Sequence, residues 1–188
     1  DFSEFKNKKI IVTGSSTGIG FETGIEFLNL GANVIFHGNQ SINDLEARIK
    51  SKSQSQNFKI FKSDFTDLSQ VDNFMNNAIN YLNGLDILVN NAGTMVGRYQ
   101  LETISEKDFL KIFDLNAKSA YFATKSACTI FKEQNYGNII NVSTISARTG
   151  GSAGSSVYAA SKAFVSGITR SLVSELSPYN IRINAISP

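Results

Sequence analysis

Short apolar runs rich in β-branched residues alternate with longer amphipathic stretches along the whole chain. The short runs predict strands over residues 9–13, 33–36, 58–61, 85–89, 138–142 and 181–184. The longer stretches have apolar positions at helical spacing, and they predict helices over residues 18–30, 42–50, 68–82, 106–132 and 157–176. Several strands are too uniformly apolar for a sheet with one face in water, which indicates that helices cover both faces.

This alternation of strands and helices favours one fold class. Strands joined by helices form right-handed crossovers and a parallel sheet, so we expect a doubly wound α/β fold with helices on both faces. No internal repeat or linker divides the chain, and residues 1–188 are expected to form a single domain. Ligands of such sheets bind at the carboxyl ends of the strands, and we expect the functional residues there.

Composition narrows the classes of partner. Of the 188 residues, 41% are hydrophobic, enough for one sizeable core without a metal or a disulfide, and we predict no metal site. The net charge is +2 and the signs are interspersed, which argues against a nucleic-acid-binding surface or a polybasic membrane anchor. No apolar run is long enough to cross a bilayer, and no signal peptide is evident. The single cysteine, Cys128, cannot form an internal disulfide, so we expect a cytoplasmic location.

A glycine-rich turn follows the first predicted strand and opens the first predicted helix. Its glycines are Gly14, Gly18 and Gly20, and the remaining positions that we assign to a site are Ser16, Thr17 and Ile19. Glycines in this context let the backbone approach a pyrophosphate, while the helix N-terminus supplies free N–H groups and a partial positive charge. Spaced glycines can also serve packing alone, but their position after the first strand favours a Rossmann-type dinucleotide site.

A tyrosine and a lysine four residues apart share one face of a helix, and the chain has two such pairs. Tyr158 and Lys162 follow the fifth predicted strand and a glycine-rich stretch, whereas Tyr121 and Lys125 lie within a long amphipathic helix. Lowering the pKa of a phenol from ~10 to ~7 takes about 4 kcal/mol, which one ammonium ~4 Å away supplies at an effective dielectric near 20. Placement therefore favours the first pair for proton transfer, and we interpret the second as a surface or interface pair.

The glycine spacing, together with Asn90-Asn91-Ala92-Gly93 and Tyr158-x-x-x-Lys162, resembles the short-chain dehydrogenase/reductase family. The resemblance is to the branch with TGxxxGxG and YxxxK motifs, and it extends from Lys9 to Pro188. It implies an NAD(P)(H)-dependent oxidoreductase that interconverts a carbonyl and a secondary alcohol on a small-molecule substrate.

The resemblance also implies roles for individual side chains. Tyr158 would be the acid/base, and Lys162 would activate it and hydrogen-bond the nicotinamide ribose. Relatives place a serine after the fifth strand to hold the substrate carbonyl; here the matching residue is Thr144. Ser143 is the alternative, and both hydroxyls could instead only cap the strand end. Asn116 matches the asparagine that holds a water linking the lysine to solvent, although a buried amide could also kink the helix.

Further positions follow for the cofactor. By resemblance, Asp64 at the end of the third strand contacts the adenine, with a turn or helix-cap role as the alternative reading, and a wall is formed by Asn90, Ala92 and Gly93. Residues 36–41, at the end of the second strand, contain no carboxylate to hold a ribose 2′-hydroxyl. We therefore predict NADP(H) in preference to NAD(H).

Two observations qualify the cofactor assignment. Thr17 and Asn39 stand where NADP-dependent relatives commonly carry a basic residue. His37, the only histidine, lies in the same segment, and we interpret it as a packing residue at the strand end in preference to a phosphate ligand.

Several broader expectations remain. The competing class is a catalytically silent nucleotide-binding regulatory protein of the same fold. By resemblance we expect a homotetramer, with the helices over 106–132 and 157–176 packed across an interface. In the family a loop after the sixth strand covers the substrate, and we expect residues 1–188 to lack that segment. Substrate identity is not specified by the positions that would line its pocket, which are Thr94, Met95, Val96, Gly150 and Gly151.

Overall fold

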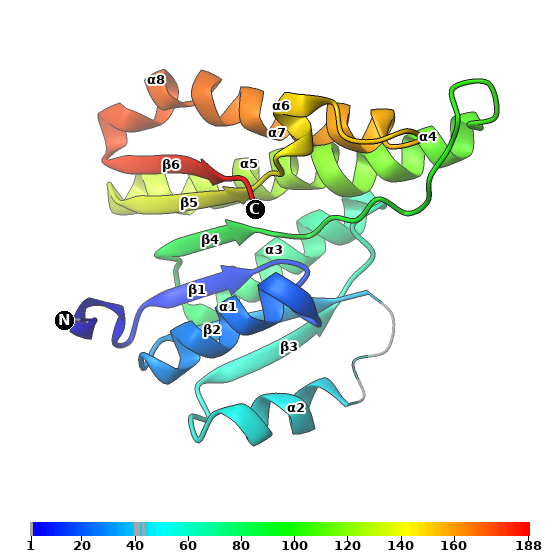
Figure 1. Cartoon of the computed structure of the whole chain (residues 1–188). Helices are drawn as coiled ribbons and strands as arrows, with labels where there is room; N and C mark the ends of the chain where they lie inside the picture. The colour runs from blue at the N-terminus through cyan, green and yellow to red at the C-terminus, as the bar shows by residue number, and fades with distance from the viewer. Residues whose placement is uncertain (1, 40–41, 43) are drawn as a thin grey trace.

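A parallel β-sheet forms the centre of the molecule (Figure 1). The computed structural model describes residues 2–39, 42 and 44–188. Within these residues six strands lie in the order β3-β2-β1-β4-β5-β6: β1 Lys9–Val12, β2 Asn33–Gly38, β3 Phe58–Lys62, β4 Ile87–Asn90, β5 Gly137–Val142 and β6 Ile181–Ile186. Ile11 of β1 is in register with Ile35 of β2 and with Leu88 of β4. The strand order reverses between β1 and β4, and this switch point is where such sheets bind ligands.

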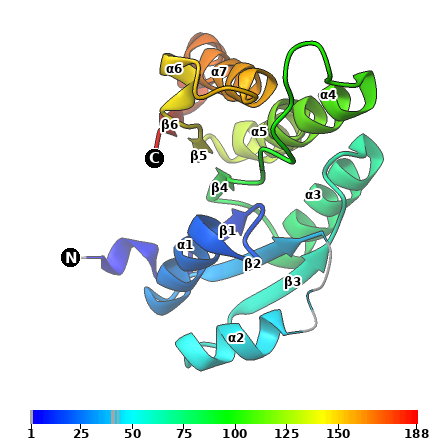
Figure 2. The same ribbon diagram turned by 45° about the vertical axis from the view of Figure 1, so that its right-hand side comes forward.

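Helices connect the strands and cover both faces of the sheet. They are α1 Gly18–Asn29, α2 Leu45–Lys52, α3 Leu68–Leu82, α4 Glu106–Phe113, α5 Ser119–Gln134, α6 Ser146–Thr149, α7 Ser156–Ser171 and α8 Val173–Leu176. In Figure 1, α1 lies in front of the sheet and α3 and α5 lie behind it, and Figure 2 shows this separation from a second direction. The arrangement confirms the predicted doubly wound α/β fold.

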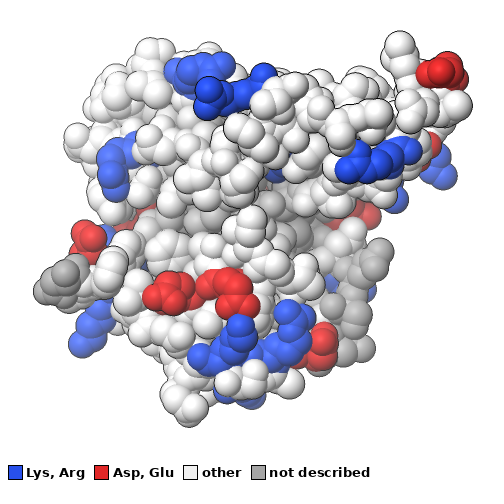
Figure 3. All heavy atoms as spheres, viewed as in Figure 1, with Lys and Arg blue, Asp and Glu red and all other residues white. Residues whose placement is uncertain are grey.

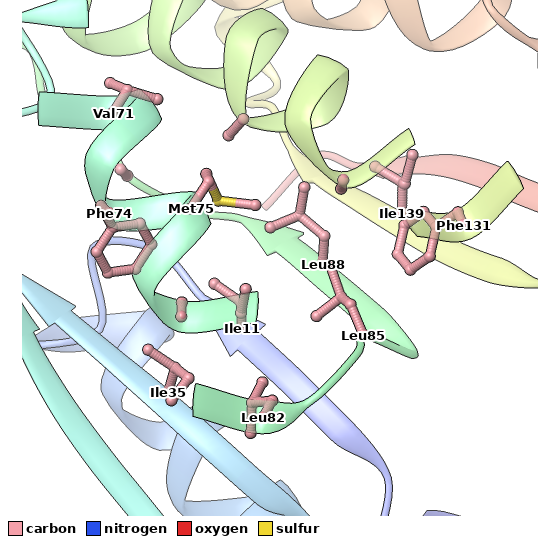
Figure 4. Close-up of a cluster of buried hydrophobic side chains, with 14 of the residues drawn as sticks. Ile11, Ile35, Val71, Phe74, Met75, Leu82, Leu85, Leu88, Phe131 and Ile139 are labelled. Carbon is pink, nitrogen blue, oxygen red and sulfur yellow. The ribbon is translucent and has the colours of Figure 1, made fainter. Parts of the chain in front are cut away.

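Each face of the sheet buries its own hydrophobic cluster. Ile10 and Val12 of β1 point to the α1 side, where they join Phe21 and Leu28 of α1. Ile11, between them, points to the opposite face and joins the cluster beneath α3 and α5 (Figure 4). Successive residues of one strand are therefore buried on opposite faces, which explains why the sequence shows continuous apolar runs without alternation.

The helix predicted over residues 106–132 is not regular, and this corrects the sequence-based boundaries. A π-helical turn, η2 Asp114–Lys118, joins α4 to α5. Within it, the side-chain amide of Asn116 donates to the carbonyl of Ile112 (2.8 Å), in competition with the backbone ladder. The helix predicted over 157–176 likewise divides into α7 and α8, and the short α6, which buries no residue, was not predicted.

Charged side chains of both signs are distributed over the surface. Figure 3 shows acidic and basic side chains next to each other over α1 and α2, where Lys52 pairs with Glu22 (2.6 Å). Among the described residues, none of the helices has the length and apolar character needed to cross a membrane.

Candidate active site

The glycine-rich turn between β1 and α1 is closely packed on one side and open on the other. A Cβ on Gly14, whose φ is +60°, would lie 2.6 Å from the Cα of Ala92, and a Cβ on Gly20 would overlap the side-chain amide of Asn91. Gly18, with φ +58°, has no atom within 4 Å of the position of a Cβ. Glycine is therefore required by packing at two positions and by backbone conformation at the third.

The first turn of α1 leaves its N–H groups available to a ligand. Thr17 is the N-cap residue, but its side chain makes no capping hydrogen bond. Thr17, Gly18 and Ile19 are all exposed, and Ser16 beside them is half-buried. Uncapped N–H groups at a helix N-terminus favour an anion, and the glycines let a pyrophosphate approach them.

Two residues that we did not assign to the site from the sequence hold the glycine-rich turn in place: Thr13, directly after β1, and Asn91, directly after β4. The hydroxyl of Thr13 accepts hydrogen bonds from the backbone N–H groups of Asn91 and Ala92, both 3.0 Å. The side-chain amide of Asn91 donates to the carbonyls of Thr13 (3.0 Å) and Gly14 (2.9 Å). Asn91 belonged to the motif used for the family resemblance, so the signal was present, but its side-chain partners depend on the pairing of β1 with β4.

Asn90 occupies a different position from its neighbour. Its side chain is buried and donates to Thr124 of α5 and to Asn141 of β5, both at 2.9 Å. The side chain therefore links strands to helices in the interior, which leaves the backbone of Asn90 and the following Ala92 and Gly93 to form the wall predicted for the cofactor.

Asp64 and Asn39, from the ends of β3 and β2, lie together. The Asp64 carboxylate accepts hydrogen bonds from the backbone N–H (2.9 Å) and hydroxyl (2.8 Å) of Thr66 and from the side chain of Asn39. Partial burial raises the pKa of this carboxyl, but the hydrogen bonds outweigh it and hold the pKa below its ordinary value. Asp64 thus adopts the turn geometry of the alternative reading and still lies at the edge where an adenine would bind. Gln40 and Ser41 of the predicted specificity segment lie outside the described residues.

Lys162 is a buried cation in the wall of the site. It lies on α7, is 4% exposed, and its ammonium donates to the carbonyl of Val142 at the end of β5 (2.8 Å). Burial lowers the pKa of Lys162 to about 8. Tyr158 lies one helical turn earlier and is half-buried. A buried ammonium one helical turn from a half-buried tyrosine is an arrangement suited to proton transfer.

The two hydroxyls after β5 are not equivalent. Ser143 is buried, and its hydroxyl donates to the carbonyl of Lys162 (3.1 Å) and pairs with the hydroxyl of Ser166 (2.8 Å). Thr144 is half-buried and receives only a long hydrogen bond from the N–H of Ser146 (3.4 Å) within the described part of the chain. Thr144 therefore retains a free donor for a substrate oxygen, whereas the Ser143 hydroxyl is committed to α7.

Asn116 is brought to the same place by the π-helical turn. Its amide group donates to the carbonyls of Thr94 and Ile112, both 2.8 Å, but its side-chain oxygen is buried without a partner. A Cβ on Gly93 would overlap that oxygen and lie 2.9 Å from the Lys162 ammonium nitrogen. Gly93 thus lies against both the Asn116 oxygen and the Lys162 ammonium, although the three residues are separated by 23 to 69 residues in the sequence.

The second Tyr-x-x-x-Lys pair lies elsewhere. Tyr121 is 39% exposed on the outer face of α5, where its ring contacts Phe122 and Phe164. Lys125 is exposed and lies over the ring of Phe122. The structure thus separates the two pairs, as their sequence contexts indicated.

Two loops meet before the start of α7, which carries Tyr158 and Lys162. The Arg98 guanidinium donates to the hydroxyl of Ser152 (2.6 Å) and to the carbonyl of Ala153 (3.2 Å), and the N–H of Tyr99 donates to the carbonyl of Gly154 (3.0 Å). The glycine-rich stretch before Tyr158 is therefore tied to the loop that follows β4. Val96 in that loop has a φ of +64°, a strained conformation for a β-branched residue and typical of functional loops.

These residues fit a nicotinamide dinucleotide. The glycine turn and the N-terminus of α1 would hold the pyrophosphate, and the Asp64 edge lies on the adenine side of it. Tyr158, Lys162 and the unpartnered oxygen of Asn116 lie on the other side of the switch point, where the nicotinamide end would bind.

Comparisons with known proteins agree with this geometry. The family model described as short chain dehydrogenase matches residues 8–188. A 3alpha-hydroxysteroid dehydrogenase of Mediterraneibacter gnavus is 37% identical, over 100% of this chain and 75% of that protein. An uncharacterized oxidoreductase of Thermotoga maritima is 34% identical over 98% of the chain and 72% of that protein.

A solved structure gives the same result. The crystal structure of NADH-dependent reductase A1-R′ complexed with NAD superposes with a TM-score of 0.93 and 32% sequence identity, covering 100% of this chain and 80% of that one. On the motifs, the sheet and these matches, the chain belongs to the short-chain dehydrogenase family of NAD(P)-dependent oxidoreductases, which interconvert carbonyl and alcohol groups.

Proposed function

We propose that the protein reduces a carbonyl group, or oxidises the corresponding alcohol, with Tyr158 as the acid/base. The observation that carries this assignment is the placement of Lys162, a buried ammonium one helical turn from a half-buried tyrosine and next to Gly93. A positive charge close to a bound substrate and the tyrosine would stabilise negative charge that develops during proton transfer. The matching pair on α5 has an exposed lysine and lacks this environment.

Each side chain of the cluster has a task in the reaction. A bound nicotinamide would supply the hydride, or accept it in the reverse direction. Tyr158 gives its phenolic proton to the substrate oxygen as negative charge develops there, and Thr144 donates a hydrogen bond to the same oxygen. Lys162 holds its charge beside the tyrosine, and Asn116 fixes the π-helical turn against Gly93.

The contrast between Ser143 and Thr144 gives a direct test. Oxidation of NADPH and NADH is measured against a panel of ketones, aldehydes and ketosugars with the wild-type protein and with Thr144→Ala, Thr144→Ser and Ser143→Ala. We expect Thr144→Ala to lower kcat by about 100-fold, the usual loss for one donor to a developing oxyanion, and Thr144→Ser to restore it. Ser143→Ala should mainly lower stability, because it removes buried hydrogen bonds to the carbonyl of Lys162 and the hydroxyl of Ser166. A larger kcat loss in Ser143→Ala than in Thr144→Ala would reverse the assignment.

We further propose that NADP(H) is preferred. Gly38, the last residue of β2, stands 20 positions after Gly18, where an acidic residue would hold a ribose 2′-hydroxyl. A Cβ on Gly38 would lie 2.9 Å from a side-chain methyl of Ile42 and 3.0 Å from the Cβ of Ser16, so the position disfavours a carboxylate. The neighbouring Asn39 carries no charge to repel a 2′-phosphate.

Cofactor choice is tested by the ratio of kcat/KM for NADPH to that for NADH. We expect the ratio to exceed 1 in the wild type, to rise in Asn39→Arg and to fall in Asn39→Asp, since one added charge next to the ribose changes phosphate binding by about tenfold. Asn39→Ala is the control for loss of the hydrogen bond to Asp64. A wild-type ratio below 1 that Asn39→Arg leaves unchanged would contradict the proposal.

The assembly state and location also remain proposals. An aromatic strip of Phe109, Phe113, Phe164 and Tyr121 crosses the outer face of α4, α5 and α7, with successive ring centroids 5.7–6.4 Å apart. We propose that a second copy covers this strip in a homotetramer, which light scattering of wild type and Phe164→Lys would test: wild type should be tetrameric and the variant smaller.

The cytoplasmic location stays a prediction. A wild-type protein that binds the cofactor without turning over any tested substrate would favour the silent regulator.

A further inference from the structure

His37 is a buried imidazole that the proposed proton transfer does not use. It is the fifth residue of β2 and is 2% exposed. Its ring stacks on Phe65 at 4.0 Å between centroids and packs against Phe74 at 4.8 Å. The side chain thus has the packing role expected from the sequence, but its polar atoms do more than pack.

The two ring nitrogens of His37 bind two different segments. The backbone N–H of Gly14 donates to Nδ1 (2.9 Å), and Nε2 lies 3.0 Å from the carbonyl oxygen of Ser63. Because a backbone N–H can only donate and a carbonyl can only accept, Nδ1 must be unprotonated and Nε2 must carry the hydrogen. Burial lowers the pKa of His37 to about 4, so this neutral form is maintained near neutral pH.

The backbone of His37 holds the same glycine turn. Its carbonyl accepts from the N–H of Ser15 (2.8 Å), and its N–H donates to the hydroxyl of Ser15 (2.8 Å). That hydroxyl in turn donates to the carbonyl of Val12 (2.6 Å). With the bond from Gly14, His37 makes three hydrogen bonds to two successive residues of the turn.

The segment on the other side of the ring leads to the adenine side of the site. Ser63 is buried and directly precedes Asp64, whose carboxylate is held by Thr66 and Asn39. One side chain therefore spans from the turn that would hold the pyrophosphate to the loop on the adenine side. Replacing it would leave the Gly14 N–H without its acceptor and the Ser63 carbonyl without its donor.

We propose that His37 is a positioning residue for the adenosine half of the cofactor, which sets the spacing between the Gly14 turn and the Asp64 loop. This inference rests on the proposed function, because it assumes that a dinucleotide binds there. Hydride transfer takes place at the other end of the cofactor, beside Tyr158 and Lys162. His37 should therefore control cofactor affinity and leave the chemical step unchanged.

The test compares three variants with the wild type. His37→Phe keeps a ring against Phe65 but has no hydrogen-bonding atom, whereas His37→Asn offers a side-chain oxygen at about the position of Nδ1 and cannot reach Ser63. Thr169→Val is the stability control: it removes a buried hydroxyl that bonds to Asn141 and Val165, on the α7 side of the sheet. The readouts are the KM of NADPH, kcat at saturating NADPH, the Kd of 2′,5′-ADP and of nicotinamide mononucleotide, and the melting temperature.

We expect His37→Phe to raise the KM of NADPH and the Kd of 2′,5′-ADP by about 10-fold or more, as for a buried donor left without an acceptor. Nicotinamide mononucleotide binding and kcat should stay within about twofold, and His37→Asn, which keeps the bond to Gly14 but not the one to Ser63, should recover only part of the loss. Thr169→Val should lower the melting temperature without changing the KM.

A His37→Phe protein with an unchanged KM, or with a lower kcat at unchanged KM, would overturn the inference. If His37→Phe does not fold, His37→Asn decides the question: a higher KM of NADPH at unchanged kcat supports the inference, and an unchanged KM overturns it. A wild-type protein that binds no nicotinamide cofactor would overturn the proposed function itself. Normal cofactor binding by both wild type and His37→Phe would overturn only the role of His37.

Discussion

The buried ammonium of Lys162 should make the stability of the cofactor-free protein depend on alkaline pH. Burial lowers its pKa from 10.5 to about 8, which corresponds to about 3 kcal/mol at 1.36 kcal/mol per pKa unit. Between these two values the unfolded chain binds more protons at this lysine than the folded protein does. The free energy of unfolding therefore rises with pH through this window, because deprotonation removes the charge that burial disfavours.

The magnitude can be isolated by comparing the wild type with Lys162→Met. Both proteins share all other titrating groups, so the difference between their unfolding free energies reports Lys162 alone. We expect this difference to change by about 2 kcal/mol in favour of the wild type between pH 7 and pH 9.5, as measured by urea unfolding at half-unit pH steps.

Lys125→Met is the matched control, because it removes the lysine of the second pair from an exposed position. Its difference from the wild type should not change over the same range. Curves for wild type and Lys162→Met that stay parallel within about 0.5 kcal/mol would refute the reasoning, since Lys162 would then not be desolvated in the folded protein.

Three further predictions concern the cofactor turn and the loops. Gly20→Ala should weaken cofactor binding by more than ~10-fold in a fluorescence titration, because its Cβ overlaps the side chain of Asn91. The Cβ of Gly18→Ala meets no protein atom, so this variant should mainly lower stability, by about 1–2 kcal/mol, through strain at φ +58°. Equal Kd values of the cofactor in the two variants would contradict this. Gly93→Ala should lower kcat, since its Cβ would overlap the side-chain oxygen of Asn116 and crowd the Lys162 ammonium. An unchanged kcat would show that these two neighbours do not matter for turnover. Arg98→Ala should raise the substrate KM and change the unfolding free energy by less than about 1 kcal/mol, because the hydrogen bonds from Arg98 to residues 152–153 are exposed. A large loss of stability with a normal KM would show that Arg98 serves folding alone.

Much of the fold was accessible from the sequence because local patterns determine it. The short apolar runs identified the six strands that the structure describes, and the glycines at Gly14 and Gly20 marked a turn whose packing allows no side chain. The π-helical turn was anticipated only as the alternative reading of Asn116, a buried amide that kinks the helix. It depends on the amide of Asn116 meeting the carbonyl of Thr94, 22 residues away, and no periodic pattern encodes that contact.

The candidate site, like the fold, could be predicted from the sequence only in part. Sequence context separated Tyr158 from Tyr121, but it could not distinguish Ser143 from Thr144 with certainty, since only the packing of α7 shows which hydroxyl is committed. His37 shows the limit most clearly. Its position at a strand end indicated packing, while its two hydrogen-bonding partners become neighbours only when β1, β2 and β3 pair.

The central claim is hydride transfer with Tyr158 as the acid/base, and transfer of deuterium from a cofactor labelled at nicotinamide C4 tests it most directly. With a substrate found in the carbonyl panel, mass spectrometry should detect deuterium on the carbinol carbon of the product in the wild type and in Tyr121→Phe at similar rates. In Tyr158→Phe the same product should form at least about 100-fold more slowly while cofactor binding is retained. Unlabelled product, or an undiminished rate in Tyr158→Phe, would contradict the account.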